Sequence, residues 1–282
     1  MLPNFLIIGA QKSGTTWLAE QLGQHPDVFM ATGEVHFFDK DYHYHKGVQW
    51  YEQHFVAANK QKAVGEKTPD YLWANGQGVE GHLADVHCHI HDLLPDVKLI
   101  VVLRNPVNRA ISAVNHIIRS GRVSPRCGID DLLMGQYKHL VAGHGVLEYG
   151  RYHEQLQAYL KLFGREQLLV LIFEEDVTAN PSKGLQKVCR FLGIDPDFPF
   201  VSQAEKKNAN THSRVRLYLN YYLPVLRSFT RPLDKIFPAH HNRPTKATVL
   251  ALQNYYQLPN QQLFDFLQRD TPISWQYQMQ TG

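Results

Sequence analysis

The sequence has few cysteines, no long hydrophobic run and no tract that resembles a linker. Its three cysteines, Cys88, Cys127 and Cys189, are widely spaced and odd in number, which excludes a disulfide framework and favours a reducing compartment. No apolar stretch reaches the roughly 20 residues that a membrane-spanning helix needs. The chain also leads from Met1 into an apolar segment without the basic start of a signal peptide. We therefore expect a soluble, cytoplasmic protein, provided that the chain is complete.

The charge balance and the histidines argue against two classes of binding site. A formal net charge of +3 over 282 residues is too small to indicate a nucleic-acid surface. The 16 histidines do not follow a metal-binding pattern. His87 and His91 would share one helix face, but the carboxylate of the zinc-protease pattern is missing, so a structural or solvent-facing role explains them better. We expect no metal site.

Short apolar runs alternate with segments of helical spacing. The runs 4–8, 63–65, 97–103 and 167–173 read as strands, and the almost continuous apolar character of 97–103 suits a central parallel strand covered on both faces. The helical segments are 17–22, 48–55, 79–94, 130–140, 147–163, 181–192, 217–229, 246–258 and 261–267. Without a linker or an internal repeat, the pattern predicts an α/β fold: one P-loop-like domain over residues 1–282, with a central parallel β-sheet flanked by helices.

Residues 9–17 form a glycine-bounded connection between the first strand and the first helix. Gly9 and Gly14 have the spacing of the triphosphate-binding motif G-x-x-x-x-G-K-[ST], but Thr15 occupies the lysine position and the lysine stands at Lys12. Backbone N–H groups and the positive end of a helix dipole would favour an anion there. The connection therefore predicts a phosphate site, although an ordinary strand-to-helix turn that contains glycine remains the alternative.

A second candidate anion site follows the strand 97–103. Nucleotide triphosphatases place a magnesium-binding aspartate at the end of the comparable strand, whereas this sequence has Arg104. An arginine attracts a phosphate with suitable fork geometry, and the carboxyl end of a central strand is where open α/β sheets bind ligands. Asn105 and Pro106 predict the start of a helix, with Ser112 about two turns into it. A surface ion pair is the alternative for Arg104.

Two acidic segments are candidates for chemistry on a hydroxyl group. If residues 34–39 are extended, alternation puts Glu34, His36 and Phe38 on one face and Val35, Phe37 and Asp39 on the other. A carboxylate beside an imidazole can act as a base and its orienting partner, but an exposed polar turn with two buried phenylalanines explains this stretch alone more simply. Glu66 and Lys67 are most simply an ion pair at the end of a strand.

Together these segments resemble the sulfotransferases that use 3′-phosphoadenosine 5′-phosphosulfate (PAPS). The run Lys12-Ser13-Gly14-Thr15-Thr16, followed by Trp17, matches the loop that binds the 5′-phosphosulfate in that family. Arg104 and Ser112, in the strand–helix segment 99–113, match the pair that holds the 3′-phosphate. Residues 34–39 and 66–71 look like two segments of the heparan sulfate (carbohydrate) sulfotransferase branch. The missing membrane anchor and lumenal disulfide make the chain similar to a soluble, bacterial-type member.

The resemblance implies PAPS as co-substrate, no metal requirement, and in-line transfer of a sulfuryl group to a hydroxyl, preferably of a saccharide. Glu34 would be the base, with His36 positioning it or acting as the base itself. Lys12 would neutralise charge on the departing phosphate, and Lys67 would support the sulfuryl oxygens. The basic segment 201–216, with Lys207, is a possible lid over the donor. It matches the family only loosely, so a surface loop remains the alternative.

Two other functions stay open on the sequence alone. The first is a small-molecule or carbohydrate kinase that uses ATP on a degenerate loop, and it predicts that ATP binds more tightly than adenosine 3′,5′-bisphosphate. The second is a nucleotide-binding module without catalysis, against which the presence of Glu34, Lys12 and Lys67 argues. The acceptor and the oligomeric state are not readable.

Overall fold

The computed structural model describes residues 1–74, 81–201, 212–238 and 242–276. A five-stranded sheet in the order β2-β3-β1-β4-β5 lies at its centre, and every neighbouring pair of strands is parallel. The strands are β1 (Phe5–Gly9), β2 (Val28–Met30), β3 (Ala63–Lys67), β4 (Lys98–Leu103) and β5 (Leu168–Ile172). The predicted α/β fold with a central parallel sheet is confirmed; the sequence did not reveal the short strand β2.

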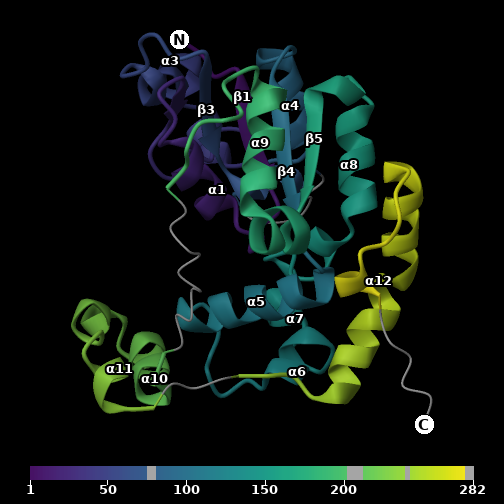
Figure 1. Cartoon of the computed structure of the whole chain (residues 1–282). Helices are drawn as coiled ribbons and strands as arrows, with labels where there is room; N and C mark the ends of the chain where they lie inside the picture. The colour runs from purple at the N-terminus through teal and green to yellow at the C-terminus, as the bar shows by residue number, and fades with distance from the viewer. Residues whose placement is uncertain (75–80, 202–211, 239–241, 277–282) are drawn as a thin grey trace.

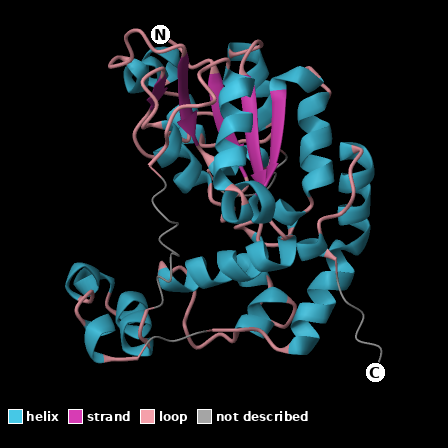
Figure 2. Cartoon of the chain, in the orientation of Figure 1, coloured by secondary structure: helices cyan, strands magenta, loops and turns pink. Residues whose placement is uncertain are grey.

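The strand order predicts a ligand-binding crevice at the carboxyl ends of β1 and β4. The chain moves from β1 to β2 and β3 on one side, and then crosses to β4 and β5 on the other side. In open α/β sheets, ligands bind where the strand order reverses in this way. Figure 2 shows all the strand arrows pointing toward a layer of helices beyond the end of the sheet. Both predicted anion-binding segments follow these two strands.

Helices cover both faces of the sheet (Figure 1). The α-helices of the described residues are α1 (Thr15–Leu22), α4 (Val86–Leu93), α5 (Pro106–Arg119), α6 (Ile129–Leu133), α7 (His139–Ala142), α8 (Tyr152–Leu160), α9 (Pro181–Leu192), α10 (Arg214–Tyr222), α11 (Leu233–Ile236) and α12 (Lys246–Leu267), with the short α2 (Asp41–Tyr44) and α3 (Gly47–Glu52) near β2 and β3. Side chains of α1 and α9 pack on one face and those of α4 and α8 on the other, so β1 and β4 are buried throughout their cores. Among the described helices, none combines the length and the apolar composition that a membrane crossing requires.

A further apolar cluster lies beyond the carboxyl edge of the sheet. It joins α5, α6 and α12, with Leu217 of α10 packed into it. The predicted cap of α5 is confirmed, because the Asn105 side chain accepts hydrogen bonds from the backbone N–H groups of Val107 and Asn108, with Pro106 as the first helical residue. This layer therefore holds α5 just beyond the carboxyl ends of the strands (Figure 1).

Several predicted helices have different bounds in the structure. The segment predicted as 79–94 is helical only as α4, whose preceding residue Asp85 has a positive φ of 54°, and residues 75–80 lie outside the described part of the chain. The segment 130–140 divides into α6 and α7 at Gly135. The segment 147–163 is helical over α8, after a separate 3-10 turn at Glu148–Gly150. Hydrophobic spacing alone did not reveal these breaks.

The last two predicted helices, 246–258 and 261–267, form one continuous helix. Helix α12 passes through Pro259, which removes one backbone donor from the helix interior. Buried residues on both sides of the proline, Leu252 and Tyr256 before it and Leu263 and Phe264 after it, hold the two halves against the rest of the chain. Tertiary packing thus overrides the local break that a proline predicts.

Candidate active site

The connection after β1 has the geometry of an anion-binding turn. Gly14 adopts a φ of +82° immediately before α1, and a Cβ there would lie 2.8 Å from the Phe173 ring. This position therefore needs glycine for both its conformation and its space. Lys12 also has a positive φ, 69°, and the Ser13 N–H donates to the Ala10 carbonyl at 3.2 Å. The turn leaves the first N–H groups of an eight-residue helix directed at the crevice.

Arg104 links the end of β4 to this connection. Its Nη1 donates to the Lys12 carbonyl oxygen at 3.0 Å, and its guanidinium lies 4.9 Å from the centre of the Phe173 ring. The backbone carbonyl of Arg104 accepts a hydrogen bond from the Tyr152 hydroxyl at 2.8 Å. The structure thus brings the two predicted anion-binding segments together. Ser112 is half-buried on α5, and nothing in the structure tests its predicted contact with a phosphate.

Positive charge gathers around Lys12 from three segments. Burial and the charges of Arg119 and Arg104 lower the pKa of Lys12, while Glu34 acts in the opposite direction. Burial and the charges of Lys12 and Arg119 also lower the pKa of His116 to about 4, so His116 is neutral at pH 7. Two positive side chains depress the proton affinity of a third because like charges repel, and a bound anion would relieve that repulsion. Sequence reasoning did not include His116 in this site.

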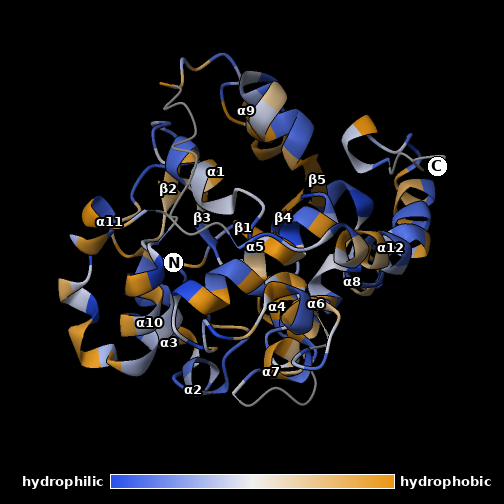
Figure 3. Ribbon diagram, turned by 90° about the horizontal axis from the view of Figure 1, so that it is seen from below, coloured by the Kyte–Doolittle hydropathy of each residue, from blue (hydrophilic) through white to orange (hydrophobic). Residues whose placement is uncertain are grey.

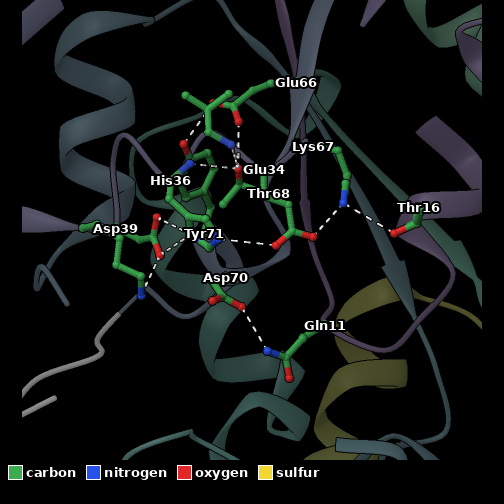
Figure 4. Close-up of polar contacts among 12 residues, drawn as sticks. Gln11, Thr16, Glu34, His36, Asp39, Glu66, Lys67, Thr68, Asp70 and Tyr71 are labelled. Carbon is green, nitrogen blue, oxygen red and sulfur yellow. Dashed lines mark hydrogen bonds and ion pairs between the residues drawn. The ribbon is translucent and has the colours of Figure 1, made fainter. Parts of the chain in front are cut away.

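Glu34 lies between two cationic groups at the carboxyl edge (Figure 4). Lys67 Nζ donates to Glu34 Oε1 at 2.6 Å, and His36 Nε2 lies 3.3 Å from Glu34 Oε2. Lys67 is 8% exposed and also lies 3.4 Å from the hydroxyl of Thr16, the second residue of α1. The structure therefore brings the predicted residues Glu34, His36, Lys67 and Thr16 into one contact network.

Asp39 completes this network behind His36. His36 Nδ1 lies 2.9 Å from Asp39 Oδ2, while its Nε2 faces Glu34, so a carboxylate occupies each ring nitrogen. Burial alone would lower the pKa of His36, but hydrogen bonds to Asp39 and Glu34 raise it to about 10. Burial would raise the pKa of Glu34, but hydrogen bonds from His36 and Lys67 lower it to about 2. At pH 7, His36 is an imidazolium and Glu34 is a carboxylate.

The alternation predicted for residues 34–39 is wrong beyond His36. His36 has a φ of +54°, which ends the extended conformation and turns the following chain. Phe37 and Phe38 are consequently both buried, at 1% and 0% exposure, and the Asp39 carboxylate comes round to the same side as His36. The prediction that Glu34 and His36 lie on one face is confirmed.

Glu66 does not pair with Lys67. Neighbouring residues of a strand point to opposite faces, and Glu66 is fully buried, where it accepts hydrogen bonds from the Tyr51, Tyr71 and Thr68 hydroxyls at 2.8, 2.9 and 2.7 Å. Burial raises the pKa of Glu66, although these three hydrogen bonds act against the shift. The predicted Glu66–Lys67 ion pair is therefore wrong, and Lys67 is available to Glu34.

Glu66 holds the segment that carries the candidate base. The Thr68 hydroxyl oxygen accepts hydrogen bonds from the backbone N–H groups of Val35 and His36 at 3.1 and 3.3 Å while it donates to Glu66. The Tyr71 hydroxyl likewise accepts from the Phe37 N–H at 2.9 Å. The buried carboxylate thus fixes two hydroxyl groups that fix the backbone around His36. Sequence reasoning missed this role because the backbone N–H groups that these hydroxyls hold lie 32 to 34 residues away in the sequence.

Among the described residues, His36, Asp39 and Asp70 form a group whose ligand atoms lie within 4.8 Å of one another. Both nitrogens of His36 already face carboxylates, and burial raises the pKa of Asp70. An imidazolium offers no lone pair to a cation. These donors fit a hydrogen-bonded network better than a metal site. His87 and His91 pack against the Tyr159 and Phe163 rings, in agreement with the structural role predicted for them.

Trp17 borders a cavity of about 210 Å³ between α1, α9 and the segment after α9. Phe198 and Phe200 line the same cavity, together with the buried Gln21. The predicted lid, 201–216, lies mostly outside the described residues, and so does Lys207. Its final residues begin α10, where Arg216 pairs with Asp234. That arginine therefore has a structural partner in α11.

Comparisons with known proteins agree with this geometry. Residues 2–215 match the family described as "Sulfotransferase domain". Mouse heparan sulfate glucosamine 3-O-sulfotransferase 3B1 is 30% identical over 263 residues, which cover 84% of this chain and 62% of that protein. Human heparan sulfate glucosamine 3-O-sulfotransferase 6 is 29% identical over 280 residues, covering 95% and 72%. The chain thus spans less than two thirds of the length of the first of these relatives.

A solved structure shares the fold. The sulfotransferase from Alicyclobacillus acidocaldarius superposes with a TM-score of 0.69 and 24% sequence identity, covering 96% of this chain and 98% of that one. At this identity the likeness concerns the fold, and it agrees with the parallel sheet and its flanking helices described above.

Proposed function

Because the chain belongs to the sulfotransferase domain family, we propose that it transfers a sulfuryl group from PAPS to a hydroxyl group of a saccharide. The observation that carries this proposal is the position of Glu34, which lies 2.6 Å from Lys67 while Lys67 approaches Thr16 of the anion-binding turn. A base, a cation and a phosphate-binding helix start therefore meet at one point. The saccharide acceptor rests on the relatives named as heparan sulfate glucosamine 3-O-sulfotransferases.

We assign donor binding to the residues around the crevice. The N–H groups of residues 13–16, with Lys12, would hold the 5′-phosphosulfate, because the helix start and the ammonium both favour an anion. Arg104 and Ser112 would hold the 3′-phosphate, and Trp17 beside its cavity would contact the adenine ring. Arg104 already lies against the Lys12 carbonyl, so a nucleotide with phosphates at two ribose positions would bridge adjacent groups.

The proposed reaction is a direct displacement at sulfur. The acceptor oxygen forms a bond to sulfur while the bond from sulfur to the bridging oxygen of the phosphosulfate breaks. The electron pair of that bond passes to the bridging oxygen of the leaving phosphate, where Lys12 would offset the negative charge. The proton of the acceptor hydroxyl passes to Glu34. General-base help of this kind contributes roughly 10²–10⁴-fold.

Glu34 is a better candidate for the base than His36. With a pKa of about 10, His36 is protonated at pH 7 and has no lone pair for another proton. A carboxylate with a pKa of about 2 is a weak base as long as Lys67 is bound to it. The sulfuryl oxygens of a bound donor would compete for the Lys67 ammonium. Loss of that partner would raise the pKa of Glu34 and strengthen the base when the donor is in place.

A kinase reaction is less well supported. Arg104 stands where nucleotide triphosphatases place the aspartate that holds magnesium, and its charge would repel that cation. We therefore expect transfer from PAPS to continue in the presence of a chelator.

We also propose that residues 1–282 form one sulfotransferase domain. This domain would contain the turn 9–17, the strand–helix segment 99–113 and the lid 201–216. Two hydrogen bonds support it: Trp275 Nε1 to Glu174 at 2.9 Å and Asn105 Nδ2 to the Ser274 carbonyl at 3.0 Å, which tie the chain's last described segment to the ends of β4 and β5.

Incubation with ³⁵S-labelled PAPS and a panel of glycan, phenol and lipid acceptors tests the proposal. We expect label to appear in a saccharide product with the wild-type protein and not with Glu34→Gln. Transfer of phosphate from labelled ATP to the same acceptors, with no transfer from PAPS, would instead identify a kinase. Binding of PAPS without a labelled product from any acceptor class would favour a non-catalytic module.

A further inference from the structure

The segment 212–238 forms a small helical projection, which we call the α10–α11 unit. It contains α10, a 3-10 turn at Pro224–Phe229 and α11, and it extends away from the sheet beside α5 (Figure 1). Its own polar contacts hold it together: the Ser213 N–H donates to Asp234 at 2.8 Å, and the Thr230 hydroxyl donates to the Asn220 side chain at 2.9 Å. The unit is therefore a defined structure and not a loose loop.

Exposed apolar side chains are concentrated in this unit. All eight residues 222–229 are exposed, and the exposed fractions of Val225, Phe229 and Ile236 are 85%, 77% and 71%. The other exposed apolar residues of the unit are Val215, Tyr222, Leu223, Leu226 and Phe237. Figure 3 shows hydrophobic residues recurring along the unit where it projects. Scattered apolar residues are normal on a protein surface, but a continuous set of this kind indicates an interaction surface.

Basic side chains surround this apolar surface. Arg214, Arg227, Arg231 and Lys235 are exposed within the unit, and the guanidinium of Arg126 lies 5.5 Å from the centre of the Tyr222 ring. Asp234 is the only acidic residue between positions 212 and 238. It already accepts a hydrogen bond from Ser213 and pairs with Arg216, so the unit carries a net positive charge.

We propose that the α10–α11 unit docks on the surface of an anionic lipid bilayer. The exposed side chains of residues 222–229 would enter the interface between headgroups and acyl chains, and the surrounding Arg and Lys side chains would contact lipid phosphates. Amphipathic helical segments with large apolar residues and Lys or Arg around them bind membranes in this manner, and each basic residue near an anionic leaflet adds to the attraction.

The charge pattern favours a bilayer over a second copy of the chain. A symmetric dimer through this surface would bring the same basic side chains of both copies together, and like charges at an interface oppose association. The surface is also a projecting turn and not a groove, so it suits insertion into a planar interface better than capture of a peptide.

Docking would also place the candidate active site close to the membrane. A Cβ at Gly121, just after α5, would lie 2.6 Å from Arg227 Nη2, so the unit packs against the end of α5. That end carries Arg119, whose charge acts on Lys12. An acceptor attached to a lipid would then be within reach of the site; this consequence depends on the proposed function, whereas the docking itself does not.

Vesicle flotation with the full chain tests the proposal. We expect the wild-type protein to float with vesicles of phosphatidylcholine that contain one quarter phosphatidylglycerol, to remain unbound with phosphatidylcholine alone, and to lose binding as salt is raised. The double variant Val225→Glu/Phe229→Glu should reduce binding to anionic vesicles by about tenfold. Arg231→Glu/Lys235→Glu should reduce it as well, because it reverses two charges at the rim.

Matched controls use exposed residues away from the unit. Val56 is 76% exposed and Lys60 is also exposed, so Val56→Glu and Lys60→Glu change apolarity and charge elsewhere and should leave flotation unchanged. Equal loss in these controls, no flotation of the wild type, or flotation that persists in Val225→Glu/Phe229→Glu would each overturn the proposal. A wild-type dimer in sedimentation, made monomeric by Phe229→Glu without any lipid binding, would assign the surface to a second copy instead.

Discussion

Two carboxylates, Glu66 of β3 and Glu34 from the segment after β2, have opposite surroundings. Glu34 is partly exposed and contacts two cationic groups, Lys67 and His36, whereas Glu66 is fully buried and contacts three hydroxyl groups. The first set of contacts lowers the pKa of Glu34 to about 2, and burial raises the pKa of Glu66. Thr68 connects them, because its hydroxyl donates to Glu66 and accepts from the backbone of residues 35 and 36.

This difference separates a chemical role from a structural one. A carboxylate that cations stabilise is ionised and accessible, so it can accept a proton when one of those cations moves to a substrate. A buried carboxyl group that satisfies hydroxyl donors fixes their positions and through them the backbone. We therefore expect substitution of Glu34 to lower turnover and substitution of Glu66 to lower stability.

The largest expected effect is on turnover in Glu34→Gln. The amide keeps the size and a hydrogen bond but cannot take the acceptor proton, so kcat should fall by roughly 10²–10⁴-fold. Calorimetry with adenosine 3′,5′-bisphosphate should give an almost unchanged affinity. A loss of nucleotide affinity in place of turnover would show that Glu34 binds the donor and is not the base.

The matching change on the buried side is Glu66→Ala. It leaves three hydroxyl groups without their acceptor and creates a cavity, so the free energy of unfolding should fall by about 3 kcal/mol. Chemical denaturation of both variants sharpens the comparison, since Glu34→Gln should unfold close to the wild type. If Glu66→Ala were as stable as the wild type, the structural role of this carboxyl group would be refuted.

Arg104→Ala tests whether the positive side chains of the crevice act on the donor independently of both carboxylates. Loss of a charge-assisted contact to a phosphate should weaken binding of adenosine 3′,5′-bisphosphate by about 10–100-fold. Binding of adenosine 5′-phosphate, which has no 3′-phosphate, should change much less. Arg104→Lys serves as the control that keeps the charge without the fork geometry. An equal loss for both nucleotides would place Arg104 on the 5′ side.

The smallest effect concerns pH and the pair His36–Asp39. The pKa of His36 is raised in the folded protein to about 10 from 6.5, so its stabilising contribution is complete below pH 6.5 and is lost as the pH rises toward 10. Asp39→Asn removes one carboxylate and should lower the pKa of His36. The wild type should therefore lose about 1–2 kcal/mol more stability than the variant between pH 6 and pH 10.

Thermal unfolding at several pH values measures this loss, and the NMR chemical shifts of His36 report its protonation directly. A wild-type His36 that titrates near pH 6.5 would contradict the ion pairs described at both of its ring nitrogens.

Local sequence signals correctly predicted the turn after β1 and the ends of two helices. The turn between β1 and α1 was readable because Gly14 and the apolar residues on each side of the turn lie close together in the sequence. The start of α5 was readable for the same reason, since Asn105 and Pro106 act within one turn of the helix. The predicted helix 181–192 has the same bounds as α9, which ends where Gly193 adopts a φ of 76°.

Contacts between distant segments were not predictable in the same way. The residues around His36 do not predict its positive φ. This backbone conformation determines that the Asp39 carboxylate lies on the same side of the segment as the His36 ring. The partner of Lys67 is 33 residues away and not its neighbour Glu66. Helix α12 continues through Pro259 because packing on both sides outweighs the local cost. These three features depend on the tertiary structure of the whole chain, so they cannot be predicted from the residues next to them in the sequence.

The proposed function depends above all on one feature: cationic side chains at the crevice between β1 and β4 bind a nucleotide. Isothermal titration calorimetry of adenosine 3′,5′-bisphosphate in the presence of a chelator, beside ATP with magnesium, tests it most directly. We predict that the bisphosphate binds at least about tenfold more tightly and that Lys12→Ala abolishes most of that difference. Tighter binding of magnesium-ATP, or bisphosphate binding that Lys12→Ala leaves unchanged, would contradict it.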